Sequence, residues 1–174
     1  MNTKTLVSLA LLVGIGAVLH AVVPGFILGM KPDLALTMMF LGIMLFPAKK
    51  NVLLIGMVTG LISALTTTFP GGQIPNIIDK PITAFLFFFL LLAVKRVNKP
   101  LVKAGLLTAI GTLISGAIFL LSALTIVGLP GGGTFAFFML TAVFPAVALN
   151  VIVMVILYPI VTGIAKRSNL VPAT

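Results

Sequence analysis

The sequence predicts an all-α integral membrane protein with six transmembrane helices. Its 174 residues are 60% hydrophobic and only 7% charged, and the mean hydropathy is +1.33. So few polar side chains cannot cover the surface of a water-soluble globule. Short polar stretches divide the chain into long apolar ones, which become helices in lipid because each must satisfy its own backbone hydrogen bonds. We expect one six-helix membrane domain over residues 1–174, surrounded by the lipid bilayer.

Six apolar segments follow in order, and each is a candidate span. The first segment is expected to remain in the protein as a helix, because no signal-peptide cleavage site follows it. The second and fourth hold only about 13 residues, or about 20 Å of helix, and are expected to borrow flanking residues, to tilt little or to lie inside the bundle. The fifth and sixth are longer, and prolines are expected to kink the sixth. The predicted segments are Leu6–Pro24, Leu34–Phe46, Val52–Phe69, Pro81–Val94, Val102–Leu129 and Thr134–Ala165.

The basic residues orient these segments. Nine of the eleven Lys and Arg residues fall at the chain ends and in the second and fourth connections: Lys4, Lys49, Lys50, Lys95, Arg96, Lys99, Lys103, Lys166 and Arg167. By the positive-inside rule these regions, and with them both termini, are cytoplasmic. The net charge of +9 thus follows from topology and gives no support to nucleic-acid binding.

The outer face is predicted to hold the remaining charges. Lys31 with Asp33, and Asp79 with Lys80, accompany prolines at what we take to be outer helix starts. Such residues are ordinary start signals, and a neighbouring Lys and Asp form a surface ion pair of little energy. They would equally suit an amino acid, whose ammonium needs a carboxylate and whose carboxylate needs Lys or helix-start N–H groups. Both interpretations stay open.

Neutral polar groups strengthen the second interpretation. Gln73 and Asn76 stand near the Asp79–Lys80 pair, while Asn150 lies deep in the last segment and His20 near the outer end of the first. A lone His is more often a hydrogen-bonded interface residue than a metal ligand, and an Asn in a span more often bonds to another helix than to a ligand. Apolar residues either surround an aromatic ring here or simply pack together: Met38, Met39, Phe40, Phe85, Phe87, Phe88 and Phe89.

Several chemistries are missing. The chain has no Cys, no phosphate-binding Lys-Ser/Thr motif, no metal-ligand cluster and no pair of catalytic carboxylates, so we expect neither an enzyme nor a cofactor or metal site. No acid falls within a predicted span, which argues against a proton relay. Uphill transport would therefore need energy from a partner.

The first segment offers a surface for such a partner. Ala10, Gly14, Ala17 and Ala21 are spaced four, three and four residues apart and therefore share one helix face. Small residues let another helix approach closely. That helix belongs either to a partner protein or to this chain.

The sequence resembles the bacterial tryptophan transporter (TrpP) family over nearly its whole length. The matching stretches are GMKPDLALTMMFLGIMLFP, GMVTGLISALTTTFPGGQIPNIIDKP and FPAVALN, at residues 29–47, 56–81 and 144–150. The resemblance implies a six-helix bundle like the substrate-binding S components of energy-coupling factor (ECF) transporters, in the bacterial cell membrane. It also implies capture of L-tryptophan from outside, and for S components a motor made of a membrane coupling subunit and two ATPases.

The expected function is therefore tryptophan uptake. The docking surface is expected on the first helix, and the substrate-binding candidates come mainly from the outer face. An S component for a vitamin or another small aromatic solute, and a noncatalytic membrane scaffold, are the alternatives, because a fold does not decide its ligand. The candidate binding residues are Asp79, Lys80, Gln73, Asn76, Lys31, Asp33, Asn150 and His20.

Overall fold

The computed structural model describes residues 2–22 and 33–168, which are helical with short connections and contain no strand. The all-α fold class is confirmed. Five helical stretches are long and apolar enough to cross a membrane: α1 (Thr3–Val22), α3 (Lys49–Thr66), α4 (Gln73–Ala93), α5 (Pro100–Ile126) and the run Phe135–Arg167. That run joins α6 (Phe135–Phe138), the π-helical turn η2 (Met139–Val143) and α7 (Phe144–Arg167), after a short 3-10 turn, η1 (Pro130–Gly132).

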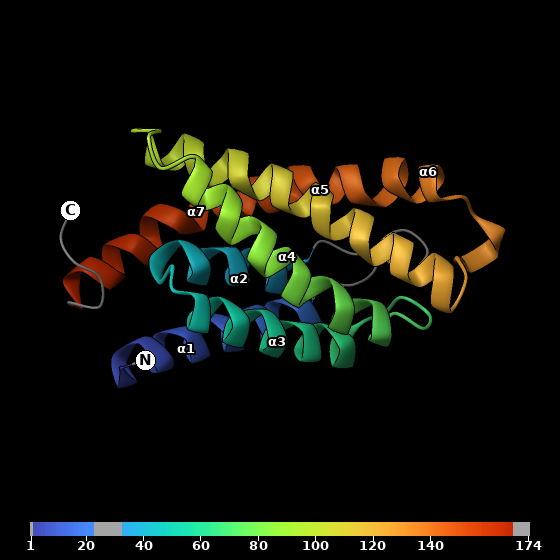
Figure 1. Ribbon diagram of the computed structural model, residues 1–174, viewed down its shortest axis with the longest axis horizontal. Helices are drawn as coiled ribbons and strands as arrows, with labels where there is room; N and C mark the ends of the chain where they lie inside the picture. Colours follow the sequence, from blue (N-terminus) through green and yellow to red (C-terminus); the bar gives the residue numbers. More distant parts are fainter. Residues whose placement is uncertain (1, 23–32, 169–174) are drawn as a thin grey trace.

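The shorter apolar helix α2 (Leu34–Leu45) lies inside the bundle, which is one of the arrangements that its length predicted. It packs against α1, α3, α4, α5 and α7, and its first ten residues, 34–43, are all buried. Twelve residues extend about 18 Å, too short to cross a hydrocarbon core of about 30 Å. Because its neighbours surround it, α2 is shielded from lipid along most of its length (Figure 1).

The predicted start of the fourth helix is wrong. We expected it at Pro81, but α4 begins at Gln73 and carries Pro81 in its interior. The connection before it turns at Gly71, whose φ of 71° is the left-handed region that glycine tolerates best. With 21 residues, α4 extends about 31 Å and is long enough to span, contrary to our expectation of a short segment.

This earlier start moves two charges into the helix. Asp79 and Lys80 do not stand at a helix start but about 9 Å along α4 from Gln73. Pro81 removes one backbone N–H from the helix, a loss that membrane helices tolerate when neighbouring groups compensate. The expectation that no acid lies within a span is therefore wrong as well, because Asp79 belongs to α4.

Helix α4 packs most extensively against α3, and two glycines of α3 bring it close. A Cβ at Gly56 would lie 2.8 Å from the Ala84 Cβ and 3.2 Å from the Pro81 Cα. One at Gly60 would lie 3.2 Å from the Asn76 carbonyl oxygen and 3.4 Å from the Lys80 Cβ. The absence of side chains at these positions lets α3 support the backbone that carries Lys80.

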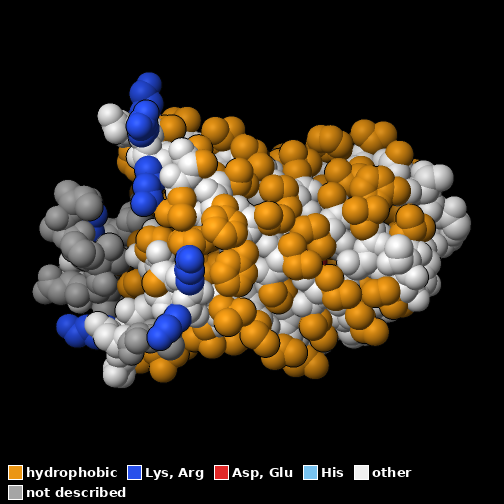
Figure 2. All heavy atoms as spheres, viewed as in Figure 1, with side chains coloured by type: hydrophobic (Ala, Val, Ile, Leu, Met, Phe, Trp, Pro, Cys, Tyr) orange, Lys and Arg blue, Asp and Glu red, His pale blue; other side chains and the backbone are white. Residues whose placement is uncertain are grey.

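The surface follows the expected membrane pattern. Large apolar side chains are exposed along the length of the bundle (Figure 2), among them Val18, Leu65, Leu140 and Ile156. Lys and Arg gather at one end, on the left in Figure 2, which is the end where Figure 1 places the start of α1 and the end of α7. A water-soluble protein would rarely expose so much apolar area, whereas lipid covers it.

The charge distribution predicts that the basic end faces the cytoplasm. Because the chain has no Cys, single cysteines can be introduced without background. In intact cells, a membrane-impermeant thiol reagent should label Gln73→Cys and Gly132→Cys, and should label Asn98→Cys and Ser168→Cys only after permeabilisation. The reverse pattern, or labelling of all four in intact cells, would overturn this orientation.

Candidate functional site

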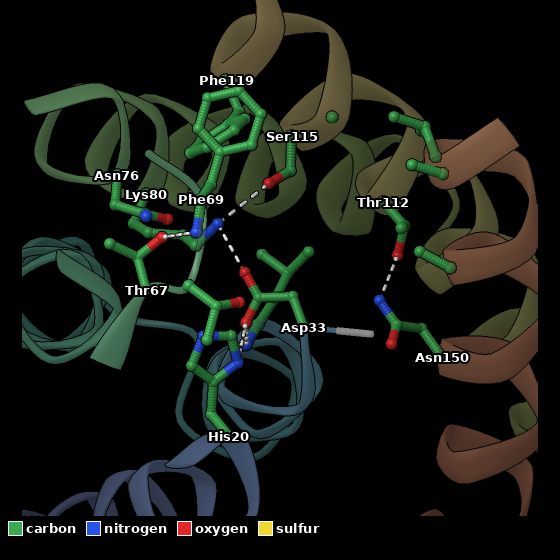
Figure 3. Close-up of a pocket in the computed structure, with 16 residues that line it drawn as sticks. His20, Asp33, Thr67, Phe69, Asn76, Lys80, Thr112, Ser115, Phe119 and Asn150 are labelled. Atoms are coloured by element: carbon green, nitrogen blue, oxygen red, sulfur yellow. Dashed lines mark hydrogen bonds and ion pairs between the residues drawn. The ribbon is translucent and has the colours of Figure 1, made fainter. Parts of the chain in front are cut away.

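A cavity opens among the helices on the side away from the basic end. It contains about 610 Å³ of atom-free space, including the part open to solvent. Figure 3 shows that distant parts of the chain meet there. The lining residues are His20 of α1; Asp33 and Leu36 at the start of α2; Thr67, Thr68 and Phe69 before α4; Asn76 and Lys80 of α4; Thr112, Ser115, Gly116 and Phe119 of α5; Ala142 and Val143 of η2; and Ala146 and Asn150 of α7.

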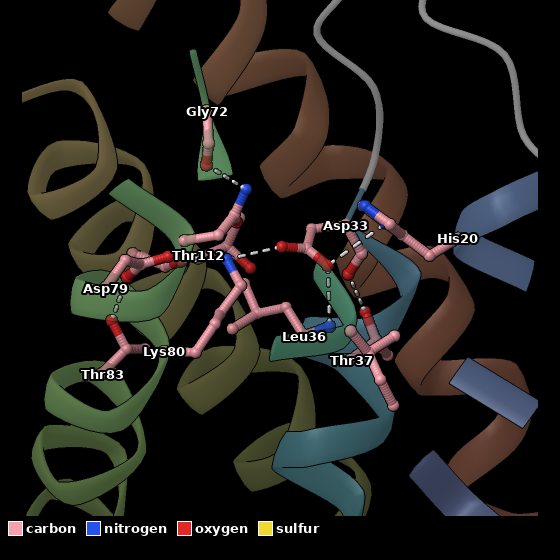
Figure 4. Close-up of polar contacts among 12 residues, drawn as sticks. His20, Asp33, Leu36, Thr37, Gly72, Asp79, Lys80, Thr83 and Thr112 are labelled. Carbon is pink, nitrogen blue, oxygen red and sulfur yellow. Dashed lines mark hydrogen bonds and ion pairs between the residues drawn. The ribbon is translucent and has the colours of Figure 1, made fainter. Parts of the chain in front are cut away.

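Lys80 is the centre of the polar part of this cavity (Figure 4). Its Nζ lies 2.6 Å from Asp33 Oδ2 and 2.6 Å from Asp79 Oδ2, and donates a longer bond of 3.3 Å to Ser115 Oγ. An ammonium group has three N–H donors, so each has a partner within the protein. Lys80 therefore holds three helices together and has no donor left for a bound carboxylate.

Asp79 lies behind Lys80 and does not line the cavity. Its side chain is completely buried, and besides Lys80 it accepts hydrogen bonds from Thr83 Oγ1 at 2.6 Å and from Ser115 Oγ at 2.7 Å. A buried carboxylate is tolerated only when it is paired and hydrogen-bonded in this way. Its position indicates that Asp79 fixes the Lys80 ammonium rather than touching a ligand.

Asp33 is the carboxylate that faces the cavity. It caps α2, because its Oδ1 accepts a hydrogen bond of 2.9 Å from the Leu36 N–H, and the His20 Nδ1 lies 3.4 Å from the same oxygen. Its side chain keeps 18% of its surface exposed. Burial raises the pKa of the Asp33 carboxyl, but the charges of Lys80 and His20 and the bonds from Lys80 and Leu36 outweigh burial and lower that pKa to about 2.

The charge balance at this end depends on His20. With both carboxylates ionised, Asp33 and Asp79 contribute two negative charges and Lys80 one positive charge, so the trio carries −1 when His20, 3.4 Å from Asp33, is neutral, and the four groups sum to zero when His20 is protonated. A cation such as an ammonium group that enters the cavity would reach this cluster at Asp33, and it would complete the balance when His20 is neutral. Within residues 2–22 and 33–168, no group of three or more His, Asp or Glu side chains is arranged to hold a metal ion.

The rest of the cavity is mainly apolar. Phe69 and Phe119 meet edge to face with ring centroids 5.1 Å apart, and Ala142, Val143 and Ala146 form the wall opposite α4. Gly116 leaves room for that wall, since a Cβ there would lie 2.5 Å from a Val143 methyl carbon. The cavity thus joins a charged end to an aromatic end, a combination suited to an amphiphilic aromatic molecule.

Five of the eight predicted binding residues line the cavity: His20, Asp33, Asn76, Lys80 and Asn150. Asp79 stands behind it, and Gln73 is exposed at the first residue of α4 and does not belong to the lining. Lys31 lies outside the described residues. These placements change the arrangement that we inferred, because Asp33 rather than Asp79 faces the space.

The aromatic surround that we considered does not line the cavity. Phe40 and Phe87 are completely buried and stack face to face, with centroids 4.0 Å apart and planes 5° from parallel. Met38 and Met39 are buried in the same core. These side chains follow the alternative interpretation, plain packing, and the aromatic walls of the cavity come from Phe69 and Phe119 instead.

Sequence reasoning missed Thr112, Phe119 and the contact made by Ser115. One signal was present: Thr108, Thr112 and Ser115 recur on one face of α5, and all three are buried. Hydroxyl residues are common in membrane helices, where they bond to their own backbone, so this pattern by itself does not distinguish a cavity wall from an ordinary helix face.

Comparisons with known proteins agree with one another. The family described as "Tryptophan transporter TrpP" matches residues 2–166. A protein of Bacillus subtilis called "Probable tryptophan transport protein" is 58% identical over 173 residues, which cover 99% of each chain. Proteins with the same description from Clostridium perfringens and Clostridium acetobutylicum are 39% and 42% identical, over 97% and 91% of each chain. No solved structure shows significant similarity.

The ion trio predicts an unusual order of stabilities. Lys80→Met should destabilise the protein by about 3–5 kcal/mol, because it leaves two carboxylates facing each other without their cation. Lys80→Met combined with Asp79→Asn should be more stable than Lys80→Met alone, because the double variant does not leave the buried Asp79 carboxylate without its cation. Thermal unfolding in detergent, with Lys95→Met as the exposed control, measures both differences. A double variant no more stable than Lys80→Met would contradict the inferred charge balance.

Proposed function

Because the chain belongs to the tryptophan transporter TrpP family, we propose that its cavity captures tryptophan from the outer side of the bacterial membrane for delivery inward. The protein is a multi-pass membrane protein and its role is tryptophan transport. The observation that carries the proposed site is the junction of an ionised carboxylate, Asp33, with an aromatic wall of Phe69 and Phe119 in one cavity.

Tryptophan fits this junction in one direction. Its ammonium group would bind Asp33, the carboxylate of the ion trio that lines the cavity. Its indole would lie against Phe69 and Phe119, since aromatic pairs gain energy beyond their buried area. A charge-assisted hydrogen bond contributes about 1.5–3 kcal/mol, and Lys80 contributes by orienting Asp33 rather than by binding the substrate carboxylate.

Capture from outside follows from the position of the cavity. Its charged residues lie near the end of α1, at the start of α2 and about 10 Å along α4 from Gln73, and these parts lie toward the end opposite the basic end of the bundle. If the basic end is cytoplasmic, the cavity is accessible from the outside. Asp79 is the acid within a described span, and because Lys80, Thr83 and Ser115 already bond to it, it is poorly suited to carry protons.

A separate energy source is therefore part of the proposal, as in the S components of ECF transporters. The predicted docking face of α1 points outward: Ala10, Gly14 and Ala21 are exposed and Ala17 is half-buried. A Cβ at Gly14 would have no other atom within 4 Å, whereas one at Gly16 would meet Met38 at 3.0 Å. The described helices thus leave the small-residue face uncovered, which favours a partner helix over internal packing.

The proposed site predicts that the substrate ammonium matters more than its carboxylate. Purified protein should bind tryptophan and should keep measurable affinity for tryptamine. It should have no measurable affinity for indole-3-propionic acid, which lacks the ammonium group. Asp33→Asn should weaken tryptophan binding by about tenfold or more while retaining the helix cap, since Asn caps as well as Asp. Equilibrium dialysis with labelled ligands measures these affinities, with the exposed Thr125→Val as control.

Three results would count against this site: unchanged affinity in a folded Asp33→Asn protein, tighter binding of indole-3-propionic acid than of tryptamine, or selective binding of a vitamin instead of tryptophan. If no small solute binds and the outer residues tolerate substitution, the scaffold interpretation would gain support.

The docking face predicts a separation of binding from uptake. Gly14→Leu and Ala17→Leu should abolish tryptophan uptake by cells, because their side chains would keep a partner helix at a distance, while purified protein should bind tryptophan as before. Ile15→Leu, on a lipid-facing side of α1, serves as the matched control. Loss of both binding and uptake would assign the face to internal packing, and uptake by the isolated chain in sealed vesicles would remove the need for a partner.

A further inference from the structure

A buried amide faces the cavity from the wall opposite Lys80. Asn150 of α7 is completely buried, and its Nδ2 donates a hydrogen bond of 3.3 Å to Thr112 Oγ1 of α5 (Figure 3). Its Oδ1 has no hydrogen-bond partner. A buried acceptor left without a donor is costly, and each such group in a folded protein calls for an explanation.

A role in joining helices explains only half of this side chain. The bond to Thr112 connects α7 to α5 through the amide nitrogen, and it directs the amide oxygen away from that contact. A Leu or Val pair would join the helices without leaving a buried acceptor. Asn150 lines the cavity together with Ala142, Val143 and Ala146, so a donor that enters the cavity and approaches the amide oxygen would satisfy it.

We propose that Asn150 Oδ1 is the acceptor for the indole N–H of the substrate and that Thr112 positions it. This inference rests on the proposed function and makes it more specific. An indole nitrogen donates one hydrogen bond and accepts none, so it needs an acceptor. Asp33 and Asn150 line different walls of the cavity, so the ammonium and the indole N–H of one tryptophan molecule would bind to different residues.

The other amides fit this role less well. Gln73 is exposed and does not line the cavity. Asn76 does line it, but its Nδ2 donates a bond of 2.8 Å to the Gly72 carbonyl, which engages the side chain at the start of α4, and it belongs to the same helix as Lys80. Asn150 is the lining amide whose oxygen is both completely buried and unpaired among the described residues.

Selectivity for the N–H should follow. A site that holds a buried acceptor rejects a ligand that lacks the matching donor far more strongly than a site that merely measures size. 3-(3-Benzothienyl)alanine replaces the indole N–H with sulfur and keeps the amino-acid part and nearly the same shape. 1-Methyltryptophan also lacks the donor and is larger.

The experiment measures ligand preference, not affinity alone. The chain contains no Trp, so tryptophan fluorescence reports binding to the purified full-length protein directly, and the analogues are measured by competition. Wild-type protein should prefer tryptophan over benzothienylalanine by about tenfold or more. Asn150→Leu should lower that ratio to near one, and Thr112→Val should lower it partly, because the amide is then present but less well oriented. Thr125→Val should leave the ratio unchanged.

Each outcome decides between the two claims. Failure of wild-type protein to bind tryptophan overturns the proposed function and this inference with it. Tryptophan binding without preference over benzothienylalanine overturns this inference and leaves the proposed function standing. The same conclusion follows if Asn150→Leu weakens both ligands equally. If Asn150→Leu does not fold, two measurements decide the matter: the preference of wild-type protein for tryptophan and its reduction in Thr112→Val. An amide that only joins the helices predicts no preference and no reduction.

Discussion

The buried ammonium of Lys80 is the interaction on which the rest of the structure depends. It joins Asp33 at the start of α2, Asp79 on its own helix and Ser115 of α5. Removing three ionised groups from water costs several kcal/mol per ion, and only mutual pairing and additional hydrogen bonds repay that cost. Incomplete assembly of this cluster is therefore heavily penalised, so the cluster specifies how α2, α4 and α5 meet.

The cluster requires a precise path for α4, and glycines provide it. Gly71 allows the turn before α4, and Gly56 and Gly60 let α3 lie directly against the turns that carry Asn76 and Lys80. With α3 so close on one side, the Lys80 side chain extends toward α2 and α5. The same cluster holds Asp33 at the cavity wall, so the packing of small residues and the placement of the Asp33 carboxylate are parts of one arrangement.

The sequence allowed most helices to be predicted, but α4 shows where such reasoning fails. The bounds of α1, α2, α3 and α5 differ from their predicted segments by a few residues, since polar residues end apolar stretches in lipid. Pro81 was misleading because proline is frequent at helix starts and is also tolerated inside membrane helices. The charge pattern cannot distinguish a proline at a helix start from one inside a helix, whereas the packing of α3 against α4 can.

Residues of the candidate site were predictable to the extent that they are rare in membrane helices. Asp33, Lys80 and Asn150 stand out in an apolar chain, and the structure brings them to one cavity. Phe119 and Thr112 do not stand out, because Phe and Thr are common in such helices whether or not they face a ligand.

The two faces of α1 connect the cavity to the proposed docking of a partner. His20 contacts Asp33 on the inner face, while Ala21 beside it belongs to the exposed small-residue face. A substrate that binds Asp33 and a partner helix that packs on α1 would therefore act on the same helix from opposite sides, and the occupancy of the cavity can influence docking without any long pathway through the protein.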